Sequence, residues 1–180
     1  MEVGQLYKMF FIKKFFNKIY YKKYSKKSYS ISNVDLILER LFKDINQGVY
    51  IDVGCNHPIK YNNTYLLHEK GWRGINVDGD KSSIKLFNLF REKDYNVNCV
   101  LSDKEEIKEF YFYHERSAIN TLSKELVNSR TTKPTKIVKI KSKTLNQILK
   151  SSPFNISKIN LLSIDVENHE YEVLKNFNFS

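Results

Sequence analysis

Residues 49–58, VYIDVGCNHP, constrain the fold of this chain more than any other stretch. The first five residues surround Asp52 with the β-branched and aromatic side chains of a buried strand, and Gly54 follows them directly. Glycine permits a sharp turn and lets the backbone approach a ligand closely. In α/β proteins, a buried strand followed by such a turn builds a small-molecule site at the carboxyl edge of the sheet. The stretch therefore predicts a strand that ends at a binding site.

Apolar spacing on both sides of this stretch alternates between the helical and the extended pattern. Helices are expected over residues 34–45, 65–70 and 84–90, and strands over residues 49–53, 74–78 and 95–101. A further strand, residues 159–166, is followed by a helix that carries Tyr171, Val173, Leu174 and Phe177. Alternation of this kind predicts an α/β fold, in which a parallel sheet has helices on its faces and the connections are right-handed crossovers.

The middle of the chain breaks this alternation. Residues 107–113 and 136–141 have strand character, whereas residues 114–135 show no regular pattern and are expected to be irregular. Within that segment, residues 117–122 are expected to form a loop over the site. Further on, TLNQ at residues 144–147 has the spacing of a capping box, which predicts that a short helix begins there.

Composition and charge limit the classes of function. A chain of 180 residues with 41% hydrophobic residues can bury one core, so we expect one domain and no wholesale disorder. Cys55 and Cys99 are too few for a disulfide framework and indicate a reducing compartment and no structural metal. The net charge is +10, but residues 1–30 contain eight lysines against one glutamate and so hold seven of those charges. We therefore expect no nucleic-acid partner.

The N-terminal arm, residues 1–30, is expected to be separate from a domain formed by residues 31–180. Apolar residues recur in the arm at helical spacing with lysines between them: Ile12, Phe15, Phe16, Ile19 and Tyr20. A basic amphipathic helix of this kind is typical of an anchor on a membrane surface or an anionic partner. The alternative is a leader helix that packs on the domain. The first interpretation predicts a cytoplasmic protein with a peripheral membrane contact through residues 8–27.

Acidic residues mark the ends of four expected strands: Asp52, Asp78, Asp103 and Asp165. Because the carboxyl ends of parallel strands share one edge, these acids are expected to converge on a single crevice. Carboxylates there can accept hydrogen bonds from ribose hydroxyls or an adenine amino group, but they repel phosphates. The chain also lacks the three-glycine dinucleotide motif and the GK[ST] phosphate loop. S-adenosylmethionine (SAM) therefore suits the crevice better than NAD or ATP, unless each acid simply caps a helix.

Three segments resemble the FkbM-type SAM-dependent methyltransferases. They are residues 51–80 (IDVGCNHP to INVDGD), 144–149 (TLNQIL) and 161–175 (LLSIDVENHEYEVLK), and the resemblance covers residues 46–178. It implies a Rossmann-like class I methyltransferase sheet with helices on both faces and SAM as the cofactor. It also implies O-methylation of a small-molecule or saccharide acceptor, as in surface-polysaccharide or natural-product biosynthesis.

The resemblance also implies roles for individual residues. Cofactor contacts fall on Asp52, Gly54 and Asn56 at the methionine end of SAM, on Asp78 at the ribose, and on Ser102 and Asp103 at the adenine. The catalytic residues fall on Asp165, Glu167 and His169, where the methyl group would be delivered. Asn168 replaces a glycine, which predicts a left-handed backbone that asparagine tolerates. Family members continue beyond the position of Ser180, which predicts a sheet truncated after its fourth parallel strand.

Several mechanisms stay open at this point. Methyl transfer to a hydroxyl needs an aligned acceptor and a base. The ordinary pKa of a histidine suits that base, so His169 is one candidate. Asp165 or Glu167 would either orient His169 or act as the base directly. The same three residues alternate like metal ligands, but no second cluster completes a shell, so no metal is expected. A second hypothesis is an inactive methyltransferase-like module held at a membrane by the arm. A third, RNA methylation through the lysines of residues 133–143, lacks an aromatic stacking platform.

Overall fold

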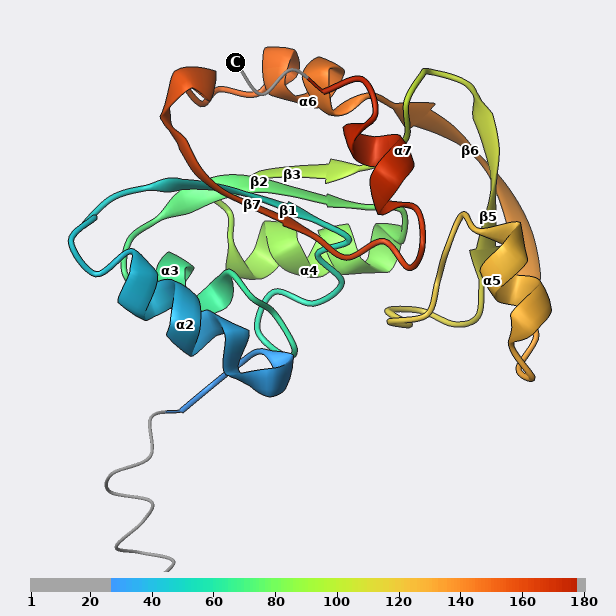
Figure 1. Ribbon diagram of the computed structural model, residues 1–180, viewed down its shortest axis with the longest axis horizontal. Helices are drawn as coiled ribbons and strands as arrows, with labels where there is room; N and C mark the ends of the chain where they lie inside the picture. Colours follow the sequence, from blue (N-terminus) through green and yellow to red (C-terminus); the bar gives the residue numbers. More distant parts are fainter. Residues whose placement is uncertain (1–26, 178–180) are drawn as a thin grey trace, which may run out of the picture.

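The computed structural model describes residues 27–177, so the predicted amphipathic helix of residues 12–20 lies outside the described residues. At the centre is a sheet of four parallel strands in the order β3-β2-β1-β7 (Figure 1). Their bounds are Val49–Val53 for β1, Arg73–Asp78 for β2, Tyr95–Asn98 for β3 and Ile159–Ile164 for β7. β1 and β2 are buried along nearly their whole length, as the central strands of a parallel sheet must be. The predicted α/β class is confirmed.

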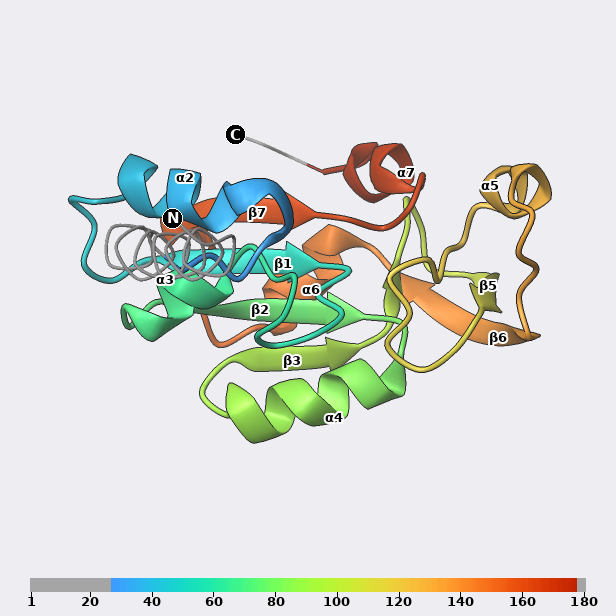
Figure 2. The ribbon, with the colours of Figure 1, turned by 90° about the horizontal axis from the view of Figure 1, so that it is seen from below.

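Helices cover both faces of this sheet (Figures 1 and 2). On one face lie α2 (Val34–Leu41), α3 (Tyr65–Glu69) and α4 (Lys81–Phe90), and on the other lies α6 (Leu145–Ser151). α7 (Glu170–Leu174) follows the carboxyl end of β7, and two 3-10 turns, η1 (Ile31–Asn33) and η2 (Ile156–Lys158), precede α2 and β7. The predicted capping box starts α6: Thr144 and Gln147 exchange two hydrogen bonds of 3.2 and 2.8 Å.

A second, smaller sheet lies beyond the carboxyl edge of the first (Figure 2). Its order is β4-β6-β5, formed by Val100–Leu101, Lys136–Lys143 and Ile107–Phe112. The prediction of one strand over residues 95–101 is therefore wrong. Pairing between β2 and β3 ends at Asp78 and Asn98, so beyond Asn98 the chain has no partner in the first sheet, and β4 pairs with β6 instead.

Two predictions about helices also need correction. α2 ends at Leu41, whereas the apolar spacing predicted a helix as far as Ile45. The segment of residues 114–135 is not wholly irregular, because it contains α5 (Lys124–Ser129). The Ser123 side chain starts this helix by accepting a hydrogen bond of 3.1 Å from the backbone N–H three residues on.

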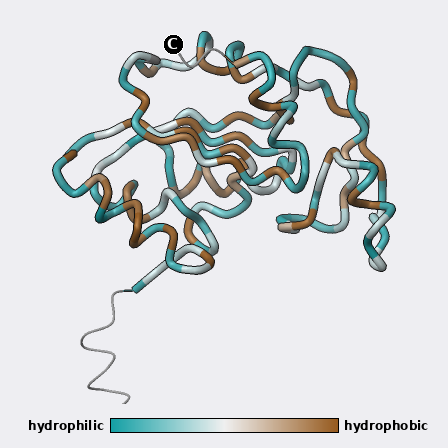
Figure 3. Tube along the Cα trace, viewed as in Figure 1, coloured by the Kyte–Doolittle hydropathy of each residue, from teal (hydrophilic) through white to brown (hydrophobic). Residues whose placement is uncertain are grey.

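The core fills the space between the first sheet and its helices. The largest cluster joins β1, β2, α6 and α7, and it includes Ile51, Val53, Ile75, Val77, Leu145, Ile148 and Val173. On the opposite face, Tyr50, Leu67 and Trp72 pack with Leu38 and Phe42 around α2 and α3. Figure 3 shows the hydrophobic residues gathered in the central strands. Within residues 27–177, no helix combines the length and the apolar character needed to cross a bilayer.

Candidate active site

A cleft opens at the carboxyl edge of the first sheet, where β1, β2 and β7 end. Gly54, directly after β1, has φ +76°, a left-handed conformation that favours glycine, and its N–H donates to Val77 O at 2.8 Å. A Cβ atom at this position would lie 1.8 Å from Asp165 O, so a larger residue would displace the turn after β7. Gly54 therefore lets the ends of the three strands approach one another at the cleft.

Asp78 is the last residue of β2, and it lines the cleft. Its Oδ2 accepts a hydrogen bond from Asn56 N at 2.8 Å, and its Oδ1 accepts one from Asp80 N at 2.7 Å. Asn56 takes φ +50° to reach this position, and it also lines the cleft. Burial raises the pKa of Asp78 to about 6, and the two N–H groups offset that effect only in part. Each carboxylate oxygen retains acceptor capacity for a ligand.

Asp165 follows β7 directly and also lines the cleft, with an exposed side chain. Its backbone N–H donates to Val53 O at 2.9 Å, which fixes the turn beside β1. Partial burial raises the pKa of Asp165, and the Glu170 carboxylate raises it further. A carboxylate with a raised pKa in a cleft is suited to accept a proton.

Most of the remaining lining is apolar. It includes Val77, Cys99, Val100, Leu101 and Phe110. Gly79 packs so closely that a Cβ atom there would lie 2.8 Å from Val100 Cγ1 and 3.0 Å from Phe110 Cζ. No lysine, arginine or histidine is among the described residues that line the cleft. Sequence patterns do not identify Phe110, but a glycine directly after a strand-end acid, as at Gly79, is a signal for close packing at a site.

The loop predicted over the site, residues 117–122, does line the cleft. Its lining residues are Ser117, Ala118, Asn120, Thr121 and Leu122. Just before the loop, Arg116 N donates to Asp80 Oδ2 at 2.5 Å, which ties it to the start of α4. The volume of the whole cleft is about 120 Å³.

Glu167 ties the other end of this loop to the turn after β7. Thr121 Oγ1 donates to Glu167 O at 2.6 Å. Arg130, which follows α5, donates to Ile119 O at 2.7 Å and pairs with the Glu167 carboxylate. Glu167 and Asn168 have φ +57° and +69°, so the left-handed backbone predicted at Asn168 is confirmed. The loop is thus held from both sides.

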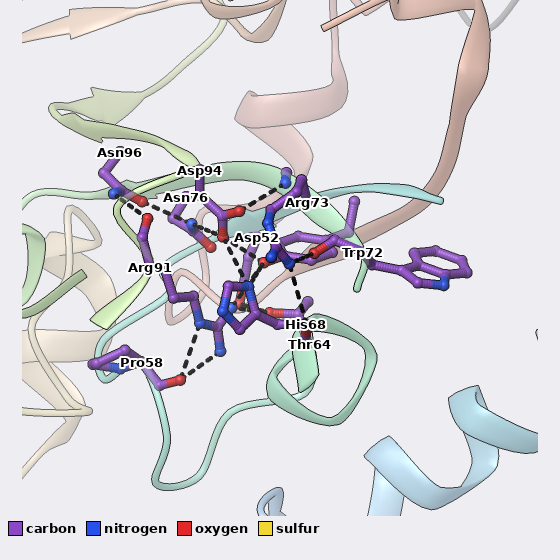
Figure 4. Close-up of polar contacts among 12 residues, drawn as sticks. Asp52, Pro58, Thr64, His68, Trp72, Arg73, Asn76, Arg91, Asp94 and Asn96 are labelled. Atoms are coloured by element: carbon purple, nitrogen blue, oxygen red, sulfur yellow. Dashed lines mark hydrogen bonds and ion pairs between the residues drawn. The ribbon is translucent and has the colours of Figure 1, made fainter. Parts of the chain in front are cut away.

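Asp52, in the middle of β1, lies in a buried polar network instead of the cleft lining (Figure 4). Its Oδ2 accepts hydrogen bonds from Asn62 Nδ2 at 3.0 Å and Thr64 Oγ1 at 2.9 Å. Arg91 is 1% exposed and donates to Asn62 Oδ1 at 2.7 Å and to Thr64 Oγ1 at 2.8 Å. Burial raises the pKa of Asp52, and the Arg91 charge opposes that rise.

The same network reaches Asp94, just before β3 (Figure 4). Tyr50 OH accepts from Arg91 at 3.2 Å and donates to Asp94 Oδ2 at 2.5 Å. Asn76 Nδ2 donates to the same oxygen at 3.0 Å, and His68 Nδ1 lies 3.6 Å from it. Burial opposes ionisation, but hydrogen bonds from His68, Tyr50 and Asn76 outweigh it and lower the pKa of Asp94. No pattern in the sequence marks Arg91 or Asp94 as buried.

Ser102 and Asp103 follow β4, not β3, and this change of sheet removes them from the cleft lining. Ser102 is fully buried, and its Oγ lies 3.2 Å from His169 Nε2. Asp103 Oδ2 lies 3.7 Å from Lys175 Nζ. The expectation that four strand-end acids share one crevice is therefore wrong, because one acid joins the Arg91 network and another follows the second sheet.

The three residues expected to act in catalysis do not form one cluster. Asp165 lines the cleft, Glu167 pairs with Arg130, and His169 lines a separate polar hollow between α5 and α7. Burial lowers the pKa of His169, which is 9% exposed. Across residues 27–177, no group of three His, Cys, Asp or Glu side chains is placed to hold a metal ion. Of the three, only Asp165 lines the cleft in the part of the chain that the structure describes.

Comparison with known protein families agrees with this architecture. A family model described as the methyltransferase FkbM domain matches residues 52–180, a range that contains Gly54, Asp78 and Asp165. Comparisons with curated proteins and with solved structures find no match. Because the family model matches well over half of the sequence, this chain belongs to the FkbM methyltransferase-domain family.

Proposed function

We propose that this chain is a SAM-dependent O-methyltransferase that acts on a hydroxyl group of a sugar or small metabolite. Family membership supports a methyltransferase in general. The observation that carries the finer proposal is the composition of the cleft, where Asp78 and Asp165 stand among apolar residues without a basic side chain in the described lining. Such a lining favours a cationic ligand without phosphate groups.

The residues of the cleft fit SAM. Asp78 ends β2, and both of its oxygens retain acceptor capacity for the two ribose hydroxyls. Val77, Val100 and Phe110 offer apolar surface for a purine ring. Gly54 and Asn56 also line the cleft, and we assign them to the methionine part of SAM. When bound, SAM supplies an electrophilic methyl group on a sulfonium centre.

Asp165 is the proposed base. Its carboxylate is exposed in the cleft, and its raised pKa brings it closer to the range in which it can take a hydroxyl proton. With SAM bound, the Asp165 carboxylate would take the hydroxyl proton as the acceptor oxygen gains the methyl group. The bond from that methyl carbon to the sulfonium sulfur would break, and neutral S-adenosylhomocysteine would leave. His169 lies outside the cleft lining and forms a hydrogen bond with Ser102. We assign His169 a structural role, in which this contact holds the start of α7.

Titration of SAM and S-adenosylhomocysteine into the full chain by calorimetry tests the cofactor proposal. Asp78→Ala removes the charged acceptor of hydrogen bonds donated by the ribose hydroxyls, worth roughly 1.5–3 kcal/mol, so affinity should fall about tenfold or more. Asp44→Ala changes an exposed acid outside the cleft lining and should leave affinity unchanged.

Asp165→Asn separates binding from chemistry. This variant should bind SAM nearly as well as the parent, while methyl transfer to a hydroxyl acceptor falls by about 10²–10⁴. Equal transfer rates in the variant and the parent would remove Asp165 from the mechanism. Absence of SAM binding by a folded parent would overturn the proposal and favour an inactive module held at a membrane by the arm.

A further inference from the structure

The apolar residues of α2 fall on two sides of the helix. Leu38 and Phe42 pack against the cluster of Tyr50, Leu67 and Trp72. Ile37 and Leu41, one turn apart on the same side, are 64% and 70% exposed. Ile31 in the preceding turn is 64% exposed as well. We call Ile31, Ile37 and Leu41 the α2 apolar surface; Figure 1 shows α2 on the outside of the sheet.

This surface continues to the mouth of the cleft. Ile31 lines the cleft, and so does Tyr61, which is 74% exposed. Exposed apolar side chains that gather on one part of a surface mark sites of interaction with a partner or a membrane. Whatever covers the α2 apolar surface therefore lies beside the cleft entrance.

The charges around this surface are mainly positive. Lys27, Arg40 and Lys43 are exposed near its residues in the chain, and the exposed Lys60 directly precedes Tyr61, against the exposed acid Asp44. Residues 1–26 add seven lysines and one glutamate. Their point of attachment is fixed at α2: Ser28 Oγ and Tyr29 N donate to the buried carboxylate of Asp35 at 2.6 and 2.7 Å. Ser28 and Tyr29, near the first described residue, are therefore held at α2.

We propose that the α2 apolar surface binds an anionic phospholipid membrane, together with the lysines of residues 8–27. Apolar side chains enter the boundary between headgroups and acyl chains, while lysines contact anionic headgroups. Like charges disfavour covering of this surface by the chain's own basic segment, whereas anionic lipid satisfies both its apolar and its basic parts. Binding in this way brings the cleft mouth to the level of the headgroups. The inference does not depend on methyl transfer.

Sedimentation of the full chain with vesicles tests it. The parent should bind vesicles of phosphatidylcholine mixed with phosphatidylglycerol and not vesicles of phosphatidylcholine alone. Ile37→Ser with Leu41→Ser should weaken binding about tenfold or more, because these side chains lose their burial in lipid. The matched control is Leu89→Ser with Ile107→Ser, which removes two apolar side chains of 71% and 64% exposure on α4 and β5. The control pair should bind like the parent.

The possible results separate the competing explanations. If Ile37→Ser with Leu41→Ser binds anionic vesicles like the parent, the α2 surface is covered by something other than lipid and the proposal falls. Equal losses in the test pair and the control pair would also overturn it. Urea denaturation of both pairs reports whether each variant is folded, and SAM titration of the parent tests the cofactor proposal separately. A failure of that proposal therefore leaves the vesicle result interpretable.

Discussion

Two sets of acidic residues in this protein have opposite surroundings. Asp52 and Asp94 are buried, and each carboxylate accepts two hydrogen bonds from side chains. Asn62 and Thr64 beside Asp52, and Tyr50 beside Asp94, also accept hydrogen bonds from Arg91. Asp78 and Asp165 lie in the cleft, where backbone N–H groups contact Asp78 and Asp165 is exposed. The carboxylates of Asp52 and Asp94 have hydrogen-bond partners within the protein, whereas those of Asp78 and Asp165 can still accept hydrogen bonds from a ligand.

The difference separates acids that hold the fold from acids available for chemistry. A buried carboxylate is stable only when a cation and hydrogen bonds compensate for its lost hydration, and the Arg91 network supplies both. A carboxylate that faces a cleft without a nearby cation keeps acceptor capacity, so it can bind a cation or accept a proton. A raised pKa does not separate the two sets, because burial raises the pKa of Asp52 as well as those of Asp78 and Asp165. Strand-end position alone does not distinguish the two sets; the partners of each oxygen do.

Arg91→Ala should have the largest effect of the substitutions considered, because it disrupts the hydrogen-bond network around Asp52 and Asp94. It removes hydrogen bonds to Pro58 O, Asn62, Thr64 and Tyr50 and leaves buried acids without a nearby cation. The free energy of unfolding should fall by about 3–5 kcal/mol, measured by urea denaturation. Arg40→Ala, at an exposed position, should change it by less than about 0.5 kcal/mol. Unfolding of Arg91→Ala at the parent's urea midpoint would contradict a structural role for the network.

Measuring the affinity for SAM as a function of pH tests the role of Asp78 in the cleft. Because the pKa of Asp78 is about 6, its carboxylate loses its charge as pH falls through that value in the free protein. SAM is cationic, so its dissociation constant should rise below pH 6, by at most about tenfold per pH unit. In Asp78→Asn the dissociation constant should be higher throughout but nearly flat between about pH 5 and 7. A parent affinity that is constant over this range would show that Asp78 does not contact the cofactor.

The strands of the first sheet and the start of α6 could be predicted because local patterns coincide with tertiary demands there. β1 is an apolar run interrupted only by Asp52 and followed by Gly54, and the Thr144 capping box satisfies backbone donors that any helix start leaves open. The positions of Asp78 and Asp165 at one cleft could be predicted because the carboxyl ends of parallel strands share one edge of the sheet.

What could not be predicted depends on partners far away in the sequence. Residues 95–101 have uniform strand character, and nothing local shows that β2 ends opposite Asn98 and forces a change of sheet. That change also carries Asp103 away from the cleft lining. Arg91 looks like a solvated residue after a helix until the loop containing Pro58 and Asn62 folds around it. Burial of a single charged side chain produces no periodic pattern in the sequence.

Arg130→Ala should have the smallest effect, and it tests how the cleft admits its ligand. The cleft volume of about 120 Å³ is well below the roughly 300–1,000 Å³ of pockets that hold drug-sized ligands. If SAM binds there as proposed, we expect residues 117–122 to move outward. Loss of the Arg130 contacts to Ile119 O and Glu167 makes that movement easier. The association rate, followed by stopped-flow fluorescence, should rise about two- to tenfold, the equivalent of one or two net hydrogen bonds.

Arg116→Ala removes a more exposed guanidinium near the same loop and should leave the rate unchanged, because only the backbone N–H of Arg116 ties the loop to Asp80. Equal rates in Arg130→Ala and the parent would mean that the loop opens without breaking its link to the turn after β7, and the cleft would then have to widen from the Asp80 side.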